Sequence, residues 1–450
     1  MQLTDPAADG ATPDARTFQR LDRRLTPDAE APVAVALSGG GDSVALLVIV
    51  ARWARARGRR LLALTVDHGL QPESAAWSRF AAEAAAAAGA DWRGLTWDGR
   101  KPASGLTAAA RAARHGLIAD AARSAGARVV LFGHTADDIA EADWMRRQGA
   151  TLGRLREWSP SPAWPEGRGL MLLRPLLAER RAGLRDWLAA RGVAWIEDPA
   201  NADARFGRSR ARIALGGAAP SRMQAVEAGQ DAVASAWSTP HDGVLRLGRG
   251  ASARTLAAAL VCAGGGATPP RGDRLNALMT RLSEGERFTA TLAGARIQAD
   301  AGAVLLMRET GELRRRRPPP LRLTPGEERT WDGRFAFRTQ AAGWTVVPAL
   351  GLLAALSPQD RARLGRLPAA ARGAAPVLIR DDASGPVLAD EAVRRRDLVP
   401  ERLALALDET THEDDLTRAR WRNAVERPIF TDMTFRPEPQ GGAPDDRGHS

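Results

Sequence analysis

The fold is decided by one stretch of sequence, Val33-Ala34-Val35-Ala36-Leu37-Ser38-Gly39-Gly40-Gly41-Asp42-Ser43. Its first five residues are apolar, as in a buried strand, and the residues from Ser43 to about Ala56 have the apolar content of a buried helix. The three glycines permit a tight turn whose backbone N–H groups converge on one spot. A helix N-terminus adds the positive end of its dipole, so the turn suits a phosphate or pyrophosphate group.

Asp42 within this turn points to a metal ion. A phosphate would repel a carboxylate unless Mg²⁺ bridged the two, so we expect Asp42 to bind Mg²⁺. No lysine follows the glycines, which excludes a phosphate loop of the Walker A type. In a purely structural alternative, the glycines only form the turn and Asp42 caps the helix. The buried strand before the loop and the flanking Ser38 and Ser43 favour the functional interpretation.

The strand and helix around the loop begin a regular alternation. Apolar runs and longer helical stretches alternate, and they predict strands at 33–37, 61–66, 92–97 and 128–132 and helices at 43–56, 73–88, 107–124 and 136–147. Strands that alternate with crossover helices form a parallel sheet covered on both faces, so we predict an α/β fold with a doubly wound sheet. Ligands of such sheets bind at the carboxyl ends of the strands.

The chain as a whole divides by composition into five segments. We predict a flexible extension at 1–30, an α/β catalytic domain at 31–215, a mainly helical middle domain with a hairpin at 216–315, a small α+β C-terminal domain at 316–435 and a disordered tail at 436–450. The boundary between the middle and C-terminal domains falls within a basic run, Arg314–Arg317, which leads into three prolines. This run is interpreted as a solvated linker, with RNA contact as the alternative.

Charge and cysteine content narrow the class of protein. The net charge of +11 favours a polyanionic partner, above all nucleic acid. The pI of 11.2 exaggerates this charge because Lys101 is the only lysine and the chain has no tyrosine. Cys262 is the only cysteine, which excludes an internal disulfide and a cysteine-based zinc site. No secretory signal or membrane-spanning apolar run is present, so we expect a cytoplasmic protein.

Further blocks of sequence carry residues suited to chemistry. They are Val66-Asp67-His68-Gly69-Leu70-Gln71-Pro72, Gly133-His134-Thr135-Ala136-Asp137-Asp138-Ile139-Ala140-Glu141, Arg174-Pro175-Leu176-Leu177 and Trp195-Ile196-Glu197-Asp198-Pro199-Ala200-Asn201. With the glycine loop, these blocks resemble in order and placement those of the tRNA(Ile)-lysidine synthetases, a family of the PP-loop superfamily of ATP pyrophosphatases. The resemblance covers about residues 31–213 and is weaker beyond them.

The resemblance implies a fold and an activity. The fold would be a PP-loop ATPase domain followed by smaller domains. The enzyme would use ATP and Mg²⁺ to adenylate the wobble cytidine of an isoleucine tRNA with a CAU anticodon. Free L-lysine would then replace AMP, so that the products are lysidine, AMP and pyrophosphate. Neither the resemblance nor the composition specifies the oligomeric state.

The matching positions receive roles by this resemblance. ATP is expected to bind Ser38, Gly39, Gly40, Gly41, Asp42, Ser43, His68 and His134. The expected catalytic residues are Asp42, Asp137, Glu141 and Arg111. The candidates for tRNA contact are Arg114, Arg174, Arg205 and Arg208, of which the last two belong to an arginine-rich strip with Arg210 and Arg212. His68 is equally compatible with a structural role, and Arg111 and Arg114 with an ordinary solvated helix face.

Helical spacing divides the acidic block further. Residues 134, 137, 138 and 141 lie at i, i+3, i+4 and i+7 and therefore form one patch. We assign Asp137 to the lysine amine, as base or as ammonium anchor, and Glu141 to its support. Asp138 is expected to cap the helix. The structural alternative for this block is a charged helix start in solvent.

The sequence departs from the family pattern at several positions. Ala108 stands where an acidic residue is usual, His115 replaces a tyrosine, and Ile139 and Ala142 replace polar residues.

A tRNA 2-thiolase of the same fold would need catalytic cysteines or an iron–sulfur cluster, and Cys262 lies outside the α/β domain. A non-catalytic RNA-binding protein that retains the ATP-binding fold is the alternative from a different class.

Overall fold

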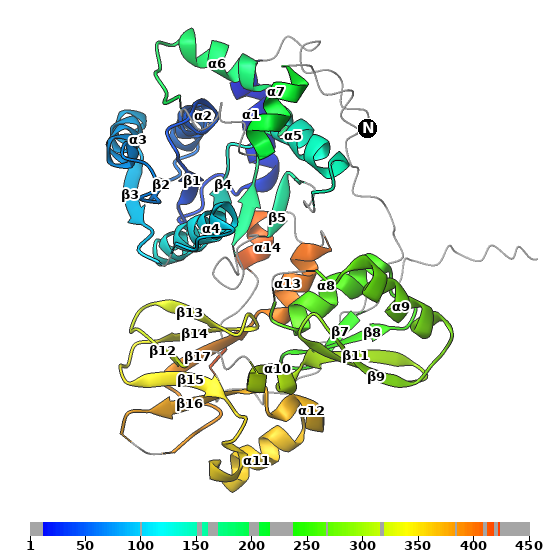
Figure 1. Cartoon of the computed structure of the whole chain (residues 1–450). Coiled ribbons are helices and arrows are strands. Elements are labelled where there is room, and N and C mark those ends of the chain that lie inside the picture. The colour runs from blue at the N-terminus through cyan, green and yellow to red at the C-terminus, as the bar shows by residue number, and fades with distance from the viewer. Residues whose placement is uncertain are drawn as a thin grey trace, which may run out of the picture.

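The computed structural model describes residues 12–423, except for residues 100, 151–154, 161–169, 198–206, 217–236, 267–268, 316–318, 383–384, 408–411 and 418–421. Figure 1 shows an N-terminal α/β half above two smaller sheet-containing parts, with α13 and α14 from the end of the described chain between them. The predicted tail at 436–450 and the start of the predicted extension lie outside the described residues. Within the described residues, no helix is long and apolar enough to cross a membrane.

A six-stranded sheet forms the centre of the N-terminal half, in the order β3-β2-β1-β4-β6-β5. Its strands are β1 (Val33–Ala36), β2 (Leu61–Asp67), β3 (Asp91–Thr96), β4 (Val129–Leu131), β5 (Trp158–Pro160) and β6 (Met171–Leu173). Every neighbouring pair is parallel except β5 with β6. The chain starts at the central β1 and winds outward to both sides, so the predicted doubly wound sheet is confirmed.

Helices cover both faces of this sheet. They are α2 (Gly41–Ala56), α3 (Ser74–Ala88), α4 (Leu106–Ser124), α5 (Ala136–Arg147), α6 (Arg181–Ala189) and α7 (Gly207–Leu215). One apolar layer includes Val35, Leu47 and Leu184, and the opposite layer is built around Leu64 and Ile118. A fully buried leucine contributes about 1.5–3 kcal/mol. The two layers therefore fix the strand ends from which the polar blocks emerge.

The N-terminal segment departs from its prediction. Residues 13–24 form helix α1 (Pro13–Arg24), which was predicted to be part of a flexible extension. Leu21 and Leu25 are fully buried in the core shared with α2, and the Trp53 indole donates to Asp22 at 2.8 Å. The segment is rich in polar residues, but Phe18, Leu21 and Leu25 recur at helical spacing and form the face that packs on the core.

The middle part of the chain also differs from its prediction. It contains a five-stranded sheet in the order β7-β8-β11-β10-β9, whereas we expected mainly helices with one hairpin. The strands are β7 (Trp237–His241), β8 (Val244–Gly248), β9 (Phe288–Leu292), β10 (Ala295–Ala299) and β11 (Ala303–Arg308), and they pack with α8 (Ala253–Ala263) and α9 (Gly272–Ser283). The predicted hairpin corresponds to β9 and β10, extended by β11. Residues 217–236 lie outside the described part.

The C-terminal part is α+β in character. One sheet has the order β12-β15-β16 and the other β13-β14-β17-β18. Their strands are β12 (Leu321–Arg322), β13 (Glu328–Trp331), β14 (Phe335–Thr339), β15 (Trp344–Pro348), β16 (Pro376–Arg380), β17 (Val393–Asp397) and β18 (Arg422–Asn423). Short helices accompany them, namely α10 (Thr310–Arg315), η2 (Leu353–Ala355), α11 (Pro358–Gly365) and α12 (Ala369–Arg372).

Two helices near the end of the described chain return to the N-terminal half, and we call them the strap helices. The first is α13 (Val399–Ala406), whose Leu403 packs in the core of the middle sheet while Leu405 packs in the N-terminal core. The second is α14 (Glu413–Thr417). Glu413 forms a buried ion pair with Arg59, with two N–O distances of 2.9 Å. The strap helices thus connect the α/β half to the later parts.

Candidate active site

A cavity of about 1000 Å³ lies at the carboxyl ends of the central strands. It is bounded by the glycine loop after β1, the segment after β2 around His68, the acidic start of α5, and residues of α6 and α7. A volume at the upper end of the usual range for ligand sites accommodates a nucleotide together with a second group. The placement agrees with the rule that doubly wound sheets bind ligands at their carboxyl edge.

The glycine loop has the geometry of a phosphate-binding turn. Gly39 has φ of +86°, a conformation that favours glycine, and a Cβ there would lie 2.6 Å from Ile196 Cδ1. Helix α2 begins at Gly41, directly after the turn. The Ser43 hydroxyl donates to the Gly40 carbonyl at 2.9 Å, and Ser43 Oγ accepts from the Ser38 backbone N–H at 3.2 Å. The loop is therefore held in shape by its own serines.

Asp42 is placed for more than helix capping. Its Oδ2 accepts from Arg181 Nε at 3.0 Å, while its Oδ1 is buried and has no hydrogen-bond partner among the described residues. Burial raises the pKa of Asp42, against the opposing effect of Arg181. A buried carboxylate oxygen without a donor is costly unless a cation or ligand satisfies it. This orphaned oxygen is what a metal site would need.

The start of α5 combines a cap with two further carboxylates. Thr135 N–H donates to Asp138 Oδ2 at 2.9 Å in a capping box, which confirms the predicted capping role of Asp138. Asp137 accepts from Arg180 Nη2 at 2.9 Å and from the Arg181 backbone N–H at 2.8 Å. Burial acts to raise the pKa of Asp137, but the hydrogen bonds from Arg180 and the Arg181 backbone lower it overall.

Glu141 lies one turn further along α5 and is almost fully buried. Its Oε1 accepts from Arg181 Nη1 at 3.0 Å and from Arg212 Nε at 2.7 Å. Its Oε2 is buried with no partner in the described structure. Asp42 and Glu141 thus each present one satisfied and one unsatisfied oxygen, and both residues line the cavity.

Arg181 is the central residue that the sequence did not reveal. It occupies the first position of α6 and contacts carboxylates from two other elements, at 3.0 Å from Asp42 and at 3.0 Å from Glu141. Burial acts to lower the pKa of Arg181, but these neighbouring carboxylates raise it overall. Arg185, one turn later, lies against the loop, since a Cβ on Gly41 would be 3.6 Å from Arg185 Nε. The adjacent Arg180-Arg181 pair is the only signal in the sequence.

The predicted histidines lie in the cavity wall. His134 stacks on one side of Phe132 with ring centroids 5.9 Å apart, and His115 stacks on Phe132 at 5.0 Å. Burial lowers the pKa of His134, and it lowers that of His115 to about 2, so both rings are neutral at pH 7. His68 lines the cavity and meets Trp97 edge-on. The buried Nδ1 atoms of His68 and His134 have no partner within the described residues.

The predicted arginines do not share one location. Arg114 and Arg208 line the cavity, and Arg208 donates to Asp138 Oδ1 at 3.1 Å. Burial lowers the pKa of Arg114 to about 10. Arg111 is not among the cavity-lining residues, although it is close enough to Arg114 for their charges to interact. Arg205 lies outside the described residues.

Arg174 is in the wrong place for the predicted contact with tRNA. It is 4% exposed, and its Nη1 donates to the Arg156 carbonyl at 2.8 Å and to Ser159 Oγ at 2.6 Å. Its guanidinium therefore fixes β5 and the residues just before it from inside the protein. The Arg-Pro-Leu block of the sequence contributes to the fold here and does not present a cation to a ligand.

The described residues contain no group of three or more His, Cys, Asp or Glu side chains that could hold a metal ion by themselves. Mg²⁺, however, is usually held by one or two carboxylates together with substrate phosphates and water. Asp42, with one unsatisfied oxygen in a phosphate-binding turn, fits this mode of binding.

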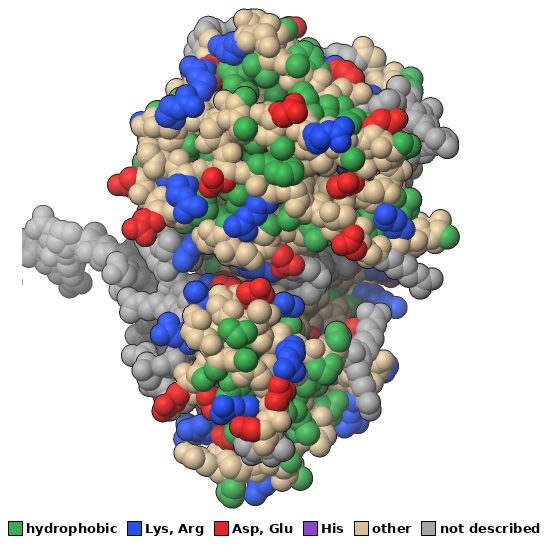
Figure 2. All heavy atoms as spheres, turned by 90° about the vertical axis from the view of Figure 1, so that its left-hand side faces the viewer, with side chains coloured by type: hydrophobic (Ala, Val, Ile, Leu, Met, Phe, Trp, Pro, Cys, Tyr) green, Lys and Arg blue, Asp and Glu red, His purple; other side chains and the backbone are tan. Residues whose placement is uncertain are grey.

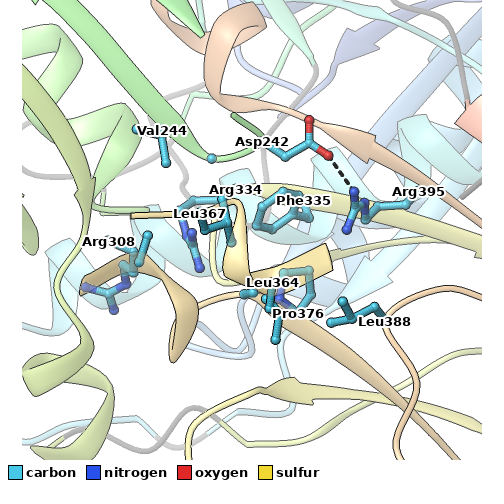
Figure 3. A pocket seen from close by; sticks show the side chains of 13 residues that line it. Asp242, Val244, Arg308, Arg334, Phe335, Leu364, Leu367, Pro376, Leu388 and Arg395 are labelled. Carbon is cyan, nitrogen blue, oxygen red and sulfur yellow. Dashed lines mark hydrogen bonds and ion pairs between the residues drawn. The ribbon is translucent and has the colours of Figure 1, made fainter. Parts of the chain in front are cut away.

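Two other features of the described structure are weaker candidates for a binding site. A cavity of about 20 Å³ lies between the middle sheet and the C-terminal part, where Figure 3 shows Arg395 paired with Asp242 beside Phe335. It has room for about one water molecule. On the face shown in Figure 2, basic and acidic side chains of the described residues are interspersed over both halves of the molecule, and these residues form no basic patch there.

Comparisons with known proteins place this site in a family. A PP-loop domain matches residues 13–218, a range that includes α1. A tRNA(Ile)-lysidine synthase of Caulobacter vibrioides is 48% identical over 396 residues, which cover 86% of this chain and 96% of that protein. One of Hyphomonas neptunium is 37% identical over 314 residues, covering 63% and 83%. Among solved structures, a U34-tRNA thiolase of Methanococcus maripaludis has a TM-score of 0.38 at 17% identity, covering 45% of this chain and 72% of that one. The chain belongs to the tRNA(Ile)-lysidine synthase family.

Proposed function

We propose that this protein forms lysidine on an isoleucine tRNA with a CAU anticodon, using ATP and free L-lysine. The observation that carries the proposal is one cavity in which a phosphate-binding turn faces buried carboxylates with unsatisfied oxygens. Family membership supports the same reaction, because the curated relatives are named as tRNA(Ile)-lysidine synthases. The PP-loop match supports the use of ATP.

The glycine loop would hold the phosphates of ATP. Backbone N–H groups at the start of α2 and the positive end of its dipole stabilise the negative charge of the pyrophosphate as it leaves. Arg181 and Arg185 lie beside this loop on one face of α6 and add two cations. His68 and His134, neutral in the cavity wall, would provide hydrogen-bonding groups with unused nitrogens for the nucleotide or the base.

Asp42 would hold Mg²⁺ through its Oδ1 atom, which has no other partner among the described residues, beside the phosphates of ATP. When bound, Mg²⁺ would neutralise charge on the phosphates and fix their orientation. This assignment also explains why a carboxylate is tolerated inside an anion-binding turn. Removal of the metal with a chelator should therefore abolish adenylation and leave the fold unchanged.

The chemistry would proceed in two displacements. The O2 oxygen of the wobble cytosine attacks the α-phosphorus of ATP, and the bond to pyrophosphate breaks. The ε-amine of lysine then attacks C2 of the activated base, and the bond from C2 to the AMP oxygen breaks. Lysine enters as an ammonium ion and must lose a proton before it attacks, so a carboxylate near the base is required.

The geometry suggests a division of roles that differs from the one assigned from sequence. Asp137 has a lowered pKa, and it accepts hydrogen bonds from Arg180 and from the first backbone N–H of α6. It is therefore better suited to hold α6 in place than to accept a proton from lysine. Glu141 has a buried, unpartnered Oε2 on the cavity side of α5. We therefore place the lysine ammonium at Glu141, with Asp137 as the residue that positions α6.

Contact with tRNA would involve arginines that line the cavity. Arg208 is partly exposed and belongs to α7, and the half-buried Arg114 of α4 lies close enough for their charges to interact. Both would meet the phosphates that flank a base inserted into the cavity, whereas the buried Arg174 would not.

The test is an ATP–pyrophosphate exchange assay with the full-length protein. Exchange should require Mg²⁺ and the CAU-anticodon tRNA but not lysine, because adenylation precedes lysine attack. A protein that binds the tRNA but shows no tRNA-dependent exchange would be a binding protein that retains the fold. Exchange without tRNA would indicate that a different acceptor is adenylated.

A further inference from the structure

One guanidinium bridges three carboxylates at the centre of the cavity. Arg181 Nε lies 3.0 Å from Asp42, Nη1 lies 3.0 Å from Glu141, and Nη2 lies 3.7 Å from Asp138. These carboxylates come from the glycine loop and from α5, while Arg181 comes from α6. A single cation therefore joins three elements that meet only in the folded protein.

Arg181 lies beside both places where the proposed function requires another cation. Asp42 is the residue proposed for Mg²⁺, and Glu141 is the one proposed for the lysine ammonium. Without ligands, the charges of Asp42 and Asp138 repel each other, and Arg181 offsets this repulsion. The guanidinium thus satisfies one oxygen of each proposed cation ligand and holds both carboxylates in place.

The phosphates of ATP would compete for the same guanidinium. Arg181 contacts Asp42 within the glycine loop, and Arg185 on the same face of α6 lies against Gly41. A triphosphate seated in the loop would therefore lie beside both side chains. Arginine binds phosphate through strong, charge-assisted hydrogen bonds, so the bound nucleotide would draw Arg181 away from the carboxylates.

We propose that Arg181 makes ATP bind before lysine. Arg181 neutralises Asp42 and Glu141 until ATP binds. The phosphates of ATP then draw Arg181 toward the glycine loop, which leaves Glu141 free to bind lysine. This inference rests on the proposed function. In the nucleotide-free protein, Arg181 repels the lysine ammonium and neutralises the charge of Glu141 through its contact with Oε1. In the nucleotide complex, the negative charge around Glu141 is exposed and attracts the ammonium. Lysine binding is therefore coupled to nucleotide binding.

The test measures binding of lysine itself. Equilibrium dialysis with radiolabelled lysine is carried out on the full chain, with and without Mg²⁺ and an ATP analogue that cannot be cleaved between the α- and β-phosphates. The wild type should bind lysine about 10-fold more tightly with the analogue, within the range usual for coupled sites. Lysine should tighten analogue binding by the same factor, since coupling is reciprocal.

Three variants separate ordering from simple structural support. Arg181→Gln should bind lysine more tightly than the wild type without nucleotide and lose most of the coupling. Arg181→Lys keeps a cation and should retain part of it. Arg212→Gln is the matched control, because Arg212 contacts Glu141 at 2.7 Å, as Arg181 does at 3.0 Å, but it comes from α7 and not from the start of α6 beside the glycine loop. Its coupling should remain near the wild-type value. Thermal unfolding of each variant verifies that it is folded.

Two results would overturn the inference. One is a wild type that binds lysine equally with and without the analogue, and the other is an Arg181→Gln protein that is folded and keeps full coupling. If the wild type transfers lysine to tRNA but shows no coupling, the ordering role fails while the proposed function stands. If it neither binds nor transfers lysine, the proposed function itself fails.

Discussion

Replacement of Glu413 by alanine should destabilise the protein far more than removal of a surface charge. Glu413 and Arg59 are 3% and 0% exposed, and the pair connects α14 to the N-terminal half. Loss of one partner of a buried ion pair typically costs roughly 3–5 kcal/mol, because the other charge remains buried and uncompensated. Arg59 would keep its bonds to the Thr26 and Ala31 carbonyls, so we expect the lower end of this range.

The magnitude can be measured by urea unfolding, monitored through tryptophan fluorescence. A loss of about 3 kcal/mol corresponds to roughly a 10²-fold change in the unfolding equilibrium. Asp381→Ala is the matched control, because its pair with Arg322 is 55% and 68% exposed and should contribute only about 0–1 kcal/mol. The double variant Arg59→Leu/Glu413→Leu should recover part of the loss, since no buried charge remains unpaired. Equal effects of Glu413→Ala and Asp381→Ala would refute the reasoning.

Three further predictions concern the C-terminal part, the site and the tRNA. Burial and the neighbouring Asp242 raise the pKa of Asp397 to about 7, so the folded state holds a proton that the unfolded state has released above pH 4. Stability should therefore fall as pH rises from about 4 to about 7, and Asp397→Asn should flatten this slope in urea titrations. Glu141→Gln should slow lysine transfer by about 10²–10⁴-fold with adenylated tRNA accumulating, whereas equal loss of both steps would place Glu141 in ATP binding. The dependence of log affinity for tRNA on log salt should weaken by about 0.7–0.9 in Arg208→Gln, and an unchanged slope would exclude a phosphate contact there.

Local sequence patterns were sufficient for strands β1 to β4 of the central sheet and for helices α2 to α5. Runs such as 33–37 and 61–64 are continuously apolar because parallel strands are buried on both faces. The glycine loop and the capping role of Asp138 were also predictable from the sequence, because both depend on hydrogen bonds between residues at most five positions apart. The position of the cavity then followed from the topology of the sheet.

The features that were missed depend on contacts between distant segments. Arg181 meets Asp42 across 139 residues of sequence, and nothing in its own helix distinguishes it from other arginines. Helix α1 is stabilised mainly by the packing of Leu21 and Leu25 in the N-terminal core, and less by the helix propensity of its sequence. Asp137 was placed correctly in the cavity wall, but its role depends on Arg180, which lies 43 residues away.

The central claim is tested most directly by transfer of radiolabelled lysine to tRNA. The full-length protein is incubated with Mg²⁺–ATP, labelled lysine and an isoleucine tRNA with a CAU anticodon, and label in the tRNA is counted. We expect ATP-dependent incorporation that is lost in Asp42→Asn and in a tRNA whose wobble cytidine is replaced by uridine. Incorporation that is unaffected by either change, or none at all from folded protein that binds ATP and the tRNA, would contradict it.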